Sequence, residues 1–315
     1  MSQTYEHARD VLFWASEHIA TSQGCALAVV TDTEGGAVRA PGALMAISAD
    51  GSSTGYLSGG CIDADVVQHA LVAIQSNQTR KLRYGVGSPF VDIQLPCGGA
   101  IEILLTPHLN EAVMRNACLS LDQRQTATIE LPKANTPICS AEADTITGWR
   151  GAVFTSCYRP KLRLRIAGRG ADVVALANVA SAGGISCIVE SPDEACLSAA
   201  ERSGADRIVK LETPGAIRAN EDDASTAFAL MFHDPHWENS LLQDALCGDA
   251  FYIGAVGSRR TQSRRREALA AAGVSSDDIA RIRGPIGLVP SMRDASMLAI
   301  SALAEIIEAF HVDNI

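Results

Sequence analysis

The amino-acid sequence predicts an α/β protein in which an N-terminal mixed α/β domain precedes a C-terminal domain built on a doubly wound parallel sheet. From residue 161 onward, strand-like and helix-like segments alternate, and such alternation builds parallel strands joined by crossover helices. Before residue 108, strands and helices mix without that regular order. A strand, a G-x-G turn and a helix follow one another over 165–177, as in Rossmann-like domains. We therefore expect domains at 1–108 and 161–315, with 109–160 as a connecting segment.

The first domain is expected to start with an amphipathic helix and to end with a strand, with glycine-rich turns between them. Asp63 and Asp65 fall in the first turn of its second helix, where carboxylates complement the helix dipole. The expected elements are a helix at 5–20, a strand at 25–32, a turn and strand at 34–48, a turn-rich hairpin at 50–61, a helix at 62–75 and a strand at 101–107.

The connecting segment is expected to hold a helix and one or two strands, and the second domain five strands and five helices. The last helix carries apolar residues at 298, 300, 303, 306, 307 and 310. Packing in the core is enough to explain them, so they give no argument of their own for a homodimer, and that possibility stays open. In the second domain, strands are expected at 162–167, 186–190, 206–211, 226–232 and 251–257, and helices at 171–182, 193–203, 235–247, 259–273 and 294–310.

Composition excludes several classes of protein. The formal net charge of −10 argues against binding to nucleic acid or to anionic membranes. No apolar run reaches the ~18 residues of a membrane span, and the N-terminus lacks a basic start followed by an apolar stretch. Hydrophobic residues make up 47% of the chain, enough for packed cores. We expect a cytoplasmic protein that binds neither nucleic acid nor membrane.

Two of the nine cysteines lie in glycine turns. Cys61 follows two glycines in "LSGGCIDADVV", and Cys97 precedes two in "LPCGGAIEIL". A thiolate suits a soft metal or sulfide transfer, and adjacent backbone N–H groups can favour its ionised form. Small cysteines packed in tight turns are an equally good interpretation of the residues alone. A disulfide is disfavoured by the expected reducing compartment.

Two glycine turns are candidates for binding phosphate. In the first, Gly168 permits a tight turn and Gly170 lets backbone approach a phosphate at a helix N-terminus. Glu190 ends the next strand, where an acid would bind ribose hydroxyls. An ordinary turn between strand and helix is the alternative. The second candidate comprises Gly257, Ser258, Arg259 and Arg260. The three arginines at 264–266 are expected to lie on a solvated helix face.

Seven short motifs give the chain a family resemblance. In their order they resemble the xanthine dehydrogenase accessory protein family, XdhC/CoxI, over nearly the whole chain and most weakly between 111 and 160. The motifs are "APGALM", "SGGCID" and "LPCGG" in the first domain and "HDP", "YIGAVGSRRT", "RGPIGL" and "LAEII" in the second.

The resemblance implies a molybdenum cofactor-binding chaperone. Such a protein protects the cofactor while a cysteine desulfurase supplies its sulfide, and it delivers the cofactor to an apo molybdenum hydroxylase of the xanthine dehydrogenase or aldehyde oxidoreductase type. A molybdopterin nucleotidyltransferase is a further candidate partner, and the mononucleotide and cytosine dinucleotide forms of molybdopterin both stay open. The protein would be a maturation factor with no catalytic residues of its own.

The resemblance also implies a set of cofactor-binding residues, with Cys61 and Cys97 as candidate molybdenum contacts. This sequence departs from the family pattern at several of them: Arg39 is retained without its usual Ser-Pro neighbours, Asp63 is a shorter acid, and Arg169 enters the glycine turn. The implied residues are Arg39, Gly59, Gly60, Cys61, Asp63, Cys97, Gly168, Arg169, Gly170, Glu190, Gly257, Ser258, Arg259 and Arg260.

Two other functions compete with this one. An NAD-dependent oxidoreductase would use the same Gly168 turn, but no clear partner for hydride transfer accompanies it. A metal-dependent hydrolase would use His233, Asp234 and His236, but supporting ligands at recognisable spacing are missing. The ligand that the purified protein retains, a pterin or NAD, would separate the first two.

Overall fold

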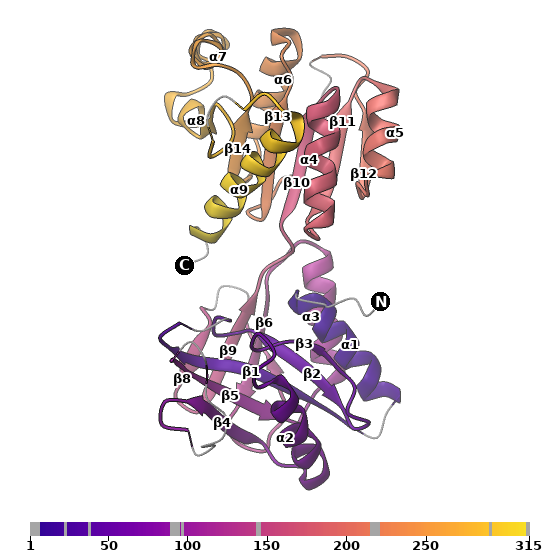
Figure 1. Cartoon of the computed structure of the whole chain (residues 1–315), viewed down its shortest axis with the longest axis vertical. Coiled ribbons are helices and arrows are strands. Elements are labelled where there is room, and N and C mark those ends of the chain that lie inside the picture. Colours follow the sequence, from indigo (N-terminus) through magenta and orange to yellow (C-terminus); the bar gives the residue numbers. More distant parts are fainter. Residues whose placement is uncertain are drawn as a thin grey trace. The chain divides into compact units, whose positions relative to one another are not determined.

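The computed structural model describes most of the chain and divides it into two compact units, Met1–Pro160 and Lys161–Ile315. The described residues are 7–21, 24–36, 39–88, 95, 98–142, 146–214, 221–289 and 292–312. Cys97 lies outside them. Both units mix helices and strands, so the predicted α/β class is confirmed (Figure 1).

Two antiparallel sheets form the first unit. Sheet A has the order β3-β2-β1-β5-β4, and sheet B has the order β7-β6-β9-β8. The strands of sheet A are β1 (Cys25–Glu34), β2 (Leu44–Ser48), β3 (Ser53–Gly55), β4 (Arg80–Gly85) and β5 (Ala100–Thr106). Those of sheet B are β6 (Ala127–Pro132), β7 (Cys139–Ser140), β8 (Gly148–Arg150) and β9 (Val153–Tyr158). The helices are α1 (Ala8–Thr21), α2 (Asp63–Ser76) and α3 (Glu111–Asp122).

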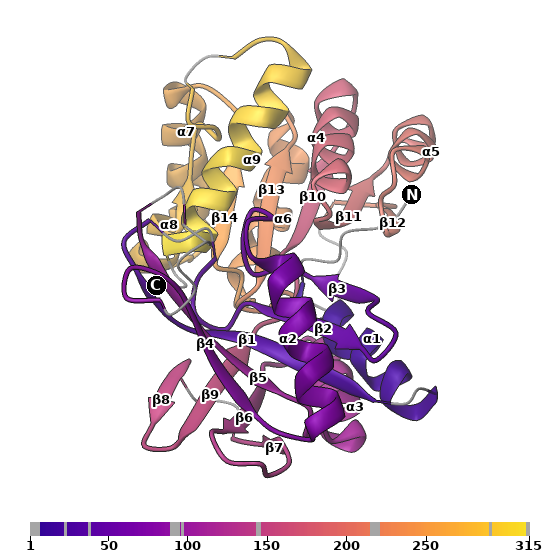
Figure 2. The ribbon, with the colours of Figure 1, turned by 60° about the horizontal axis from the view of Figure 1, so that its bottom comes forward.

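Each face of sheet A has its own apolar core, because successive residues of a strand point to opposite faces. On one face α2 packs through Val66, Ala70 and Ala73 (Figure 2). On the other face, α1, α3 and sheet B close a second core. Residues 109–160 therefore contribute a helix and a whole sheet to the first unit, and they share its core.

The second unit is built on sheet C, a six-stranded sheet in the order β12-β11-β10-β13-β14-β15 in which every neighbouring pair is parallel. Its strands are β10 (Arg163–Gly168), β11 (Ser186–Ser191), β12 (Arg207–Lys210), β13 (Thr226–Met231), β14 (Tyr252–Ala255) and β15 (Ile282–Arg283). Its helices are α4 (Ala171–Ala182), α5 (Glu194–Arg202), α6 (Pro235–Leu246), α7 (Arg259–Ala271), α8 (Ser276–Ala280) and α9 (Ala295–Val312).

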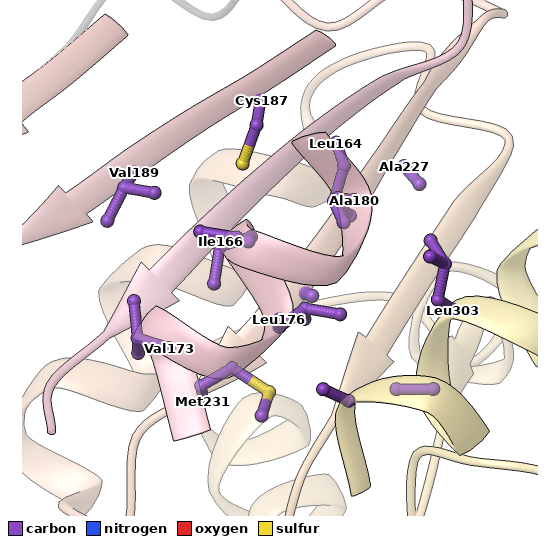
Figure 3. Packing of buried hydrophobic residues seen from close by; sticks show 14 of the residues in the cluster. Leu164, Ile166, Val173, Leu176, Ala180, Cys187, Val189, Ala227, Met231 and Leu303 are labelled. Atoms are coloured by element: carbon purple, nitrogen blue, oxygen red, sulfur yellow. The ribbon is translucent and has the colours of Figure 1, made fainter. Parts of the chain in front are cut away.

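Helices cover both faces of sheet C, as a doubly wound sheet requires. Residues from α4, α5 and α9 pack on one face, and residues from α6, α7 and α8 pack on the other. Figure 3 shows the first of these cores, where Val173 of α4 and Met231 of β13 lie close to β10. The strand order changes direction between β10 and β13, which is where ligands bind in open α/β sheets.

Two expectations about helix faces were wrong. Arg265 of α7 is buried rather than solvated, because its guanidinium pairs with Glu238 of α6. In α9, Ile300 and Ile307 are 53% and 48% exposed, so core packing does not account for them. No described helix combines the length and the apolar character that crossing a membrane would require.

Candidate functional site

One end of sheet A gathers the segments that carry the predicted residues of the first unit. β1 ends there at Glu34, which pairs with Ala100 at the start of β5. β4 and β3 also end there, at Gly85 and Gly55. The turn with Arg39, the loop with Cys61 and the approach to β5 after Cys97 therefore leave the sheet at the same end. Cys97 itself lies outside the described residues.

The loop that carries Cys61 is closed by its own side chains. The Asp63 carboxylate accepts hydrogen bonds from the backbone N–H groups of Leu57 and Ser58, both at 3.1 Å. The Ser58 hydroxyl accepts from the N–H groups of Gly60 and Ile62 at 3.1 and 3.3 Å. Asp63 thus holds the loop in shape, a role that its spacing from Cys61 did not reveal.

The Cys61 side chain is exposed at the tip of this loop. Gly60 has a φ of 99°, a backbone conformation that favours glycine, and a Cβ on Gly59 or Gly60 would meet open space. These glycines therefore leave room beside the thiol. The Arg39 guanidinium lies 4.3 Å from the ring centroid of Tyr56, at the start of the same loop.

The two glycines after Cys97 have a structural explanation. A Cβ on Gly99 would lie 2.3 Å from the Glu34 carbonyl oxygen, and one on Gly85 would lie 2.0 Å from the Gly99 carbonyl oxygen. Gly98 has a φ of 68°. Close approach of three strands therefore requires glycine here, whatever the cysteine does.

A polar cluster beneath the Cys61 loop was not predicted. The Tyr84 hydroxyl donates to the Asp65 carboxylate at 2.6 Å, and His69 Nε2 lies 3.4 Å from the same oxygen. Burial and the neighbouring Asp65 raise the pKa of Tyr84. The spacing of Asp65 and His69, one turn apart on α2, was the available signal, but Tyr84 reaches them from strand β4.

The turn after β10 has the geometry expected of a nucleotide-type turn. A Cβ on Gly168 would lie 2.7 Å from Val173 Cγ2 and 2.8 Å from Met231 Cβ, so only glycine fits. Gly170 is the N-cap of α4, with a φ of 83° and open space where a Cβ would be. The Arg169 guanidinium lies 5.3 Å from the ring centroid of Phe232, which follows β13. Arg169 therefore places a cation beside the change in strand order.

Among the helices whose N-cap residue is described, two begin differently from the rest. α3, α5, α6, α7 and α8 each start at a residue whose side chain accepts a backbone N–H group. The N-cap residues of α2 and α4, Ile62 and Gly170, make no such bond. The first N–H groups of a helix need acceptors from outside it. Among these seven helices, the two without a capping side chain follow the Cys61 and Gly168 turns, whereas α7, after the Gly257 turn, is capped by Ser258.

Glu190 is not oriented like a ribose ligand. It is buried, and its carboxylate lies 3.3 Å from the Arg165 guanidinium. Arg165 also contacts Asp222 and Asp244. Burial alone would lower the pKa of Arg165, but Glu190 and the two aspartates raise it, so the guanidinium stays charged. Glu190 therefore balances a buried cation.

The turn between β14 and α7 places two exposed arginines at a helix start. Gly257 has a φ of 120°, and a Cβ there would lie 2.9 Å from Thr261 Cγ2. The Ser258 hydroxyl accepts from the Thr261 N–H at 3.2 Å and so caps α7 itself. Arg259 and Arg260 are exposed. Ser258 is therefore already engaged, and the two arginines are the residues of this turn that can meet an anion.

The three residues considered as ligands of a hydrolase metal do not converge on a common point. Asp234 caps α6 by accepting from the His236 N–H at 3.0 Å, and His233 and His236 are exposed. Within the described ranges, no group of three or more histidine, cysteine, aspartate or glutamate residues is arranged to hold a metal ion.

The fold and these two sets of turns define a two-domain protein that joins a cysteine-bearing α/β domain to a Rossmann-like domain. Residues 164–306 match the family model for the XdhC Rossmann domain, and residues 18–85 match that of the XdhC and CoxI family. Together with the relative described next, these matches show that the chain belongs to the XdhC and CoxI family. The resemblance seen in the motifs is confirmed.

Known relatives extend the similarity over almost the whole chain. The chain is 34% identical to the molybdenum cofactor insertion chaperone PaoD of Escherichia coli K12, over 95% of this chain and 87% of that one. It is 23% identical to a probable xanthine dehydrogenase subunit of Bacillus subtilis 168, over 90% and 92%. The crystal structure of a xanthine dehydrogenase from Bacillus halodurans has the same fold, with a TM-score of 0.76, 22% identity and coverage of 97% and 96%.

Proposed function

We propose that this protein is a molybdenum cofactor-binding chaperone that protects the cofactor, supports its sulfuration and delivers it to an apo molybdenum hydroxylase. The similarity to PaoD over 95% of the chain supports this function. The geometric observation that carries it is that α2 and α4, the helices after the Cys61 and Gly168 turns, begin without a capping side chain. In each, the first backbone N–H groups could donate hydrogen bonds to a bound anion or oxo group.

The first unit would meet the metal end of the cofactor. Cys61 offers an exposed thiol, and its soft sulfur suits molybdenum or sulfide. Gly59 and Gly60 leave open space beside it, and Asp63 fixes the loop from behind. Arg39, held against Tyr56 at the same end of the sheet, would meet the anionic pterin or its phosphate. Cys97 is proposed as a second contact from the sequence alone.

The second unit offers a candidate phosphate-binding turn of its own. Gly168 and Gly170 bring backbone to the N-terminus of α4, where the helix dipole favours a negative group. Arg169 adds a positive charge at the change in strand order, and Arg259 and Arg260 supply two more beyond β14. Asp172 in the first turn of α4 opposes an anion, so the arginines are needed to offset it. The cytosine dinucleotide form would use this turn most fully.

The partners follow from the proposed activity. Delivery requires an apo molybdenum hydroxylase, and sulfuration requires a cysteine desulfurase as the source of sulfide. If the cofactor is a dinucleotide, a molybdopterin nucleotidyltransferase would load the protein. The chaperone itself would bind and release without turnover.

An NAD-dependent oxidoreductase is the weaker candidate. A nicotinamide dinucleotide site needs an acid at the end of the second strand for the ribose hydroxyls. Here Glu190 occupies that position but is buried against Arg165, and binding ribose would require breaking a buried ion pair.

The test is retention of molybdopterin by the full chain purified from cells that make the cofactor, followed by activation of an apo hydroxylase. Cys61→Ser and Cys97→Ser should each lower retained pterin. Cys139→Ser is the matched control, because Cys139 is also exposed in the first unit. If both variants retain and deliver cofactor as well as the parent, neither cysteine contacts the cofactor and the proposed metal contact is wrong.

The phosphate site has its own test. Gly170→Asp and Gly170→Asn share size and backbone strain, but only Asp adds a negative charge at the N-terminus of α4. Affinity for the cofactor should fall at least about tenfold more in the Asp variant. Equal affinities would place the phosphate elsewhere.

A further inference from the structure

α9 has one apolar face inside the second unit and another facing outward. The inner face packs in the core with α4 through Ala299, Ala302, Leu303 and Ile306. On the outer face, Met297, Ile300 and Ile307 are 52%, 53% and 48% exposed. Leu288 and Val289, each 52% exposed, lie beside this face because their N–H groups donate to Ser301 at 3.2 and 2.8 Å.

The outward residues have the spacing of a helix-packing seam. Met297, Ile300, Ala304, Ile307 and His311 recur at intervals of three, four, three and four residues. Side chains at this spacing form a stripe that packs against a second helix, knobs into holes. We call these five residues the α9 seam. Scattered exposed apolar residues would not share one stripe.

We propose that the α9 seam is a homodimer interface in which α9 packs antiparallel against α9 of a second copy of this chain. Two-fold pairing about Ala302 sets Ile300 opposite Ala304 and Met297 opposite Ile307, while His311 falls opposite Arg293. Ala304 is partly exposed and has a small side chain, so the larger Ile300 of the other copy can pack over it. The four apolar residues of the seam therefore pair with one another across the two copies.

Charges at the two ends agree with antiparallel pairing. Arg293 lies just before α9 and Glu308 lies in its last turns, and both are exposed. Pairing about the same centre brings Arg293 of one copy within one helical turn of Glu308 of the other, at both ends of the interface. The helix dipoles also oppose each other in this arrangement. A parallel pair would place like charges together.

Sedimentation of the full chain over about 1 to 200 μM measures the interface directly, since dissociation in this range reports micromolar affinity. We expect a reversible monomer–dimer equilibrium. Ile300→Glu should weaken it at least about thirtyfold, as loss of a central interface residue does. Leu119→Glu is the matched control, because Leu119 is 56% exposed on α3. A chain that stays monomeric throughout, or a dimer that survives Ile300→Glu unchanged, overturns the proposal.

Charge reversal distinguishes self-pairing from binding of another partner. Arg293→Glu and Glu308→Arg should each weaken the dimer, and the double variant should restore it because opposite charges again face each other. Since both residues are exposed, the variants are expected to keep the circular dichroism spectrum of the parent. Failure of the double variant to restore association rules out antiparallel pairing of α9. Neither experiment depends on the cofactor.

Discussion

At the scale of single residues, the two glycines of the turn after β10 are required for different reasons. A methyl group on Gly168 would collide with Val173 and Met231. A methyl group on Gly170 would have open space around it, but the φ of 83° there is a backbone conformation that strains any residue with a side chain. The G-x-G pattern predicted the turn and both glycines. The pattern could not show that Gly168 is required for packing and Gly170 for its backbone conformation. The packing at Gly168 depends on Met231, which lies on a strand far along the sequence.

Gly168→Ala should cost more than Gly170→Ala. The first substitution overpacks the core and should lower the free energy of unfolding by about 2–3 kcal/mol. The second places alanine in the left-handed region and should cost about 1 kcal/mol. Urea unfolding followed by tryptophan fluorescence and circular dichroism measures both. The reverse order of stability would contradict the geometry of this turn.

Among the described cysteines, the exposed thiols should react faster than the buried ones. Burial raises the pKa of Cys25 and of Cys187 to about 12 and that of Cys118 to about 11, so these thiols stay protonated and unreactive near neutral pH. Alkylation of the native protein, followed by mass spectrometry, should modify the exposed cysteines first. Modification of Cys187 before Cys61 would contradict the structure. The exposed cysteines are Cys61, Cys139 and Cys247.

At the scale of elements, periodicity predicted most helices and the parallel strands of sheet C, because those segments are long and strongly apolar. It missed β4, β7, β8, α8 and β15, which are short or carry many polar residues. It also misplaced Arg265. A run of arginines is typical of a solvated face, and only the packing of α6 against α7 supplies Glu238 as a buried partner. The same limit explains Glu190, whose partner Arg165 lies on a different strand.

The pair formed by Arg265 and Glu238 should couple α6 to α7. Glu238→Gln leaves a buried guanidinium without its counter-charge and should lower the free energy of unfolding by about 3–5 kcal/mol. Arg264→Gln, an exposed change on the same helix, should stay within about 0.5 kcal/mol of the parent. Thermal and urea unfolding would measure both, and equal effects would contradict the burial of Arg265.

Glu102 of sheet A should contribute to acid sensitivity. Burial alone would raise its pKa, but Lys81 and Arg83 outweigh that effect and hold the pKa below the usual carboxyl value. A lowered pKa in the folded state gives stability that is complete above the unfolded pKa and lost as pH falls through the folded one. Glu102→Gln should therefore lose less stability than the parent between about pH 7 and about pH 3. Identical pH profiles would show that the two cations do not act on Glu102.

At the scale of the whole molecule, each unit brings its candidate residues together through its own topology. Antiparallel register places three loops at one end of sheet A, and parallel crossover places the Gly168 and Gly257 turns at the carboxyl edge of sheet C. The sequence motifs assigned the candidate residues to two groups, one in each domain. The uncapped starts of α2 and α4 and the outward seam of α9 emerge only from the folded backbone.

The most direct test of the central claim is to purify the full chain from cells that make the molybdenum cofactor and to quantify bound pterin and bound nicotinamide dinucleotide in one preparation. We expect near-stoichiometric pterin, its transfer to an apo molybdenum hydroxylase with recovery of activity, and loss of pterin in Cys61→Ser. Retained nicotinamide dinucleotide without pterin, and no activation of the hydroxylase, would contradict the account.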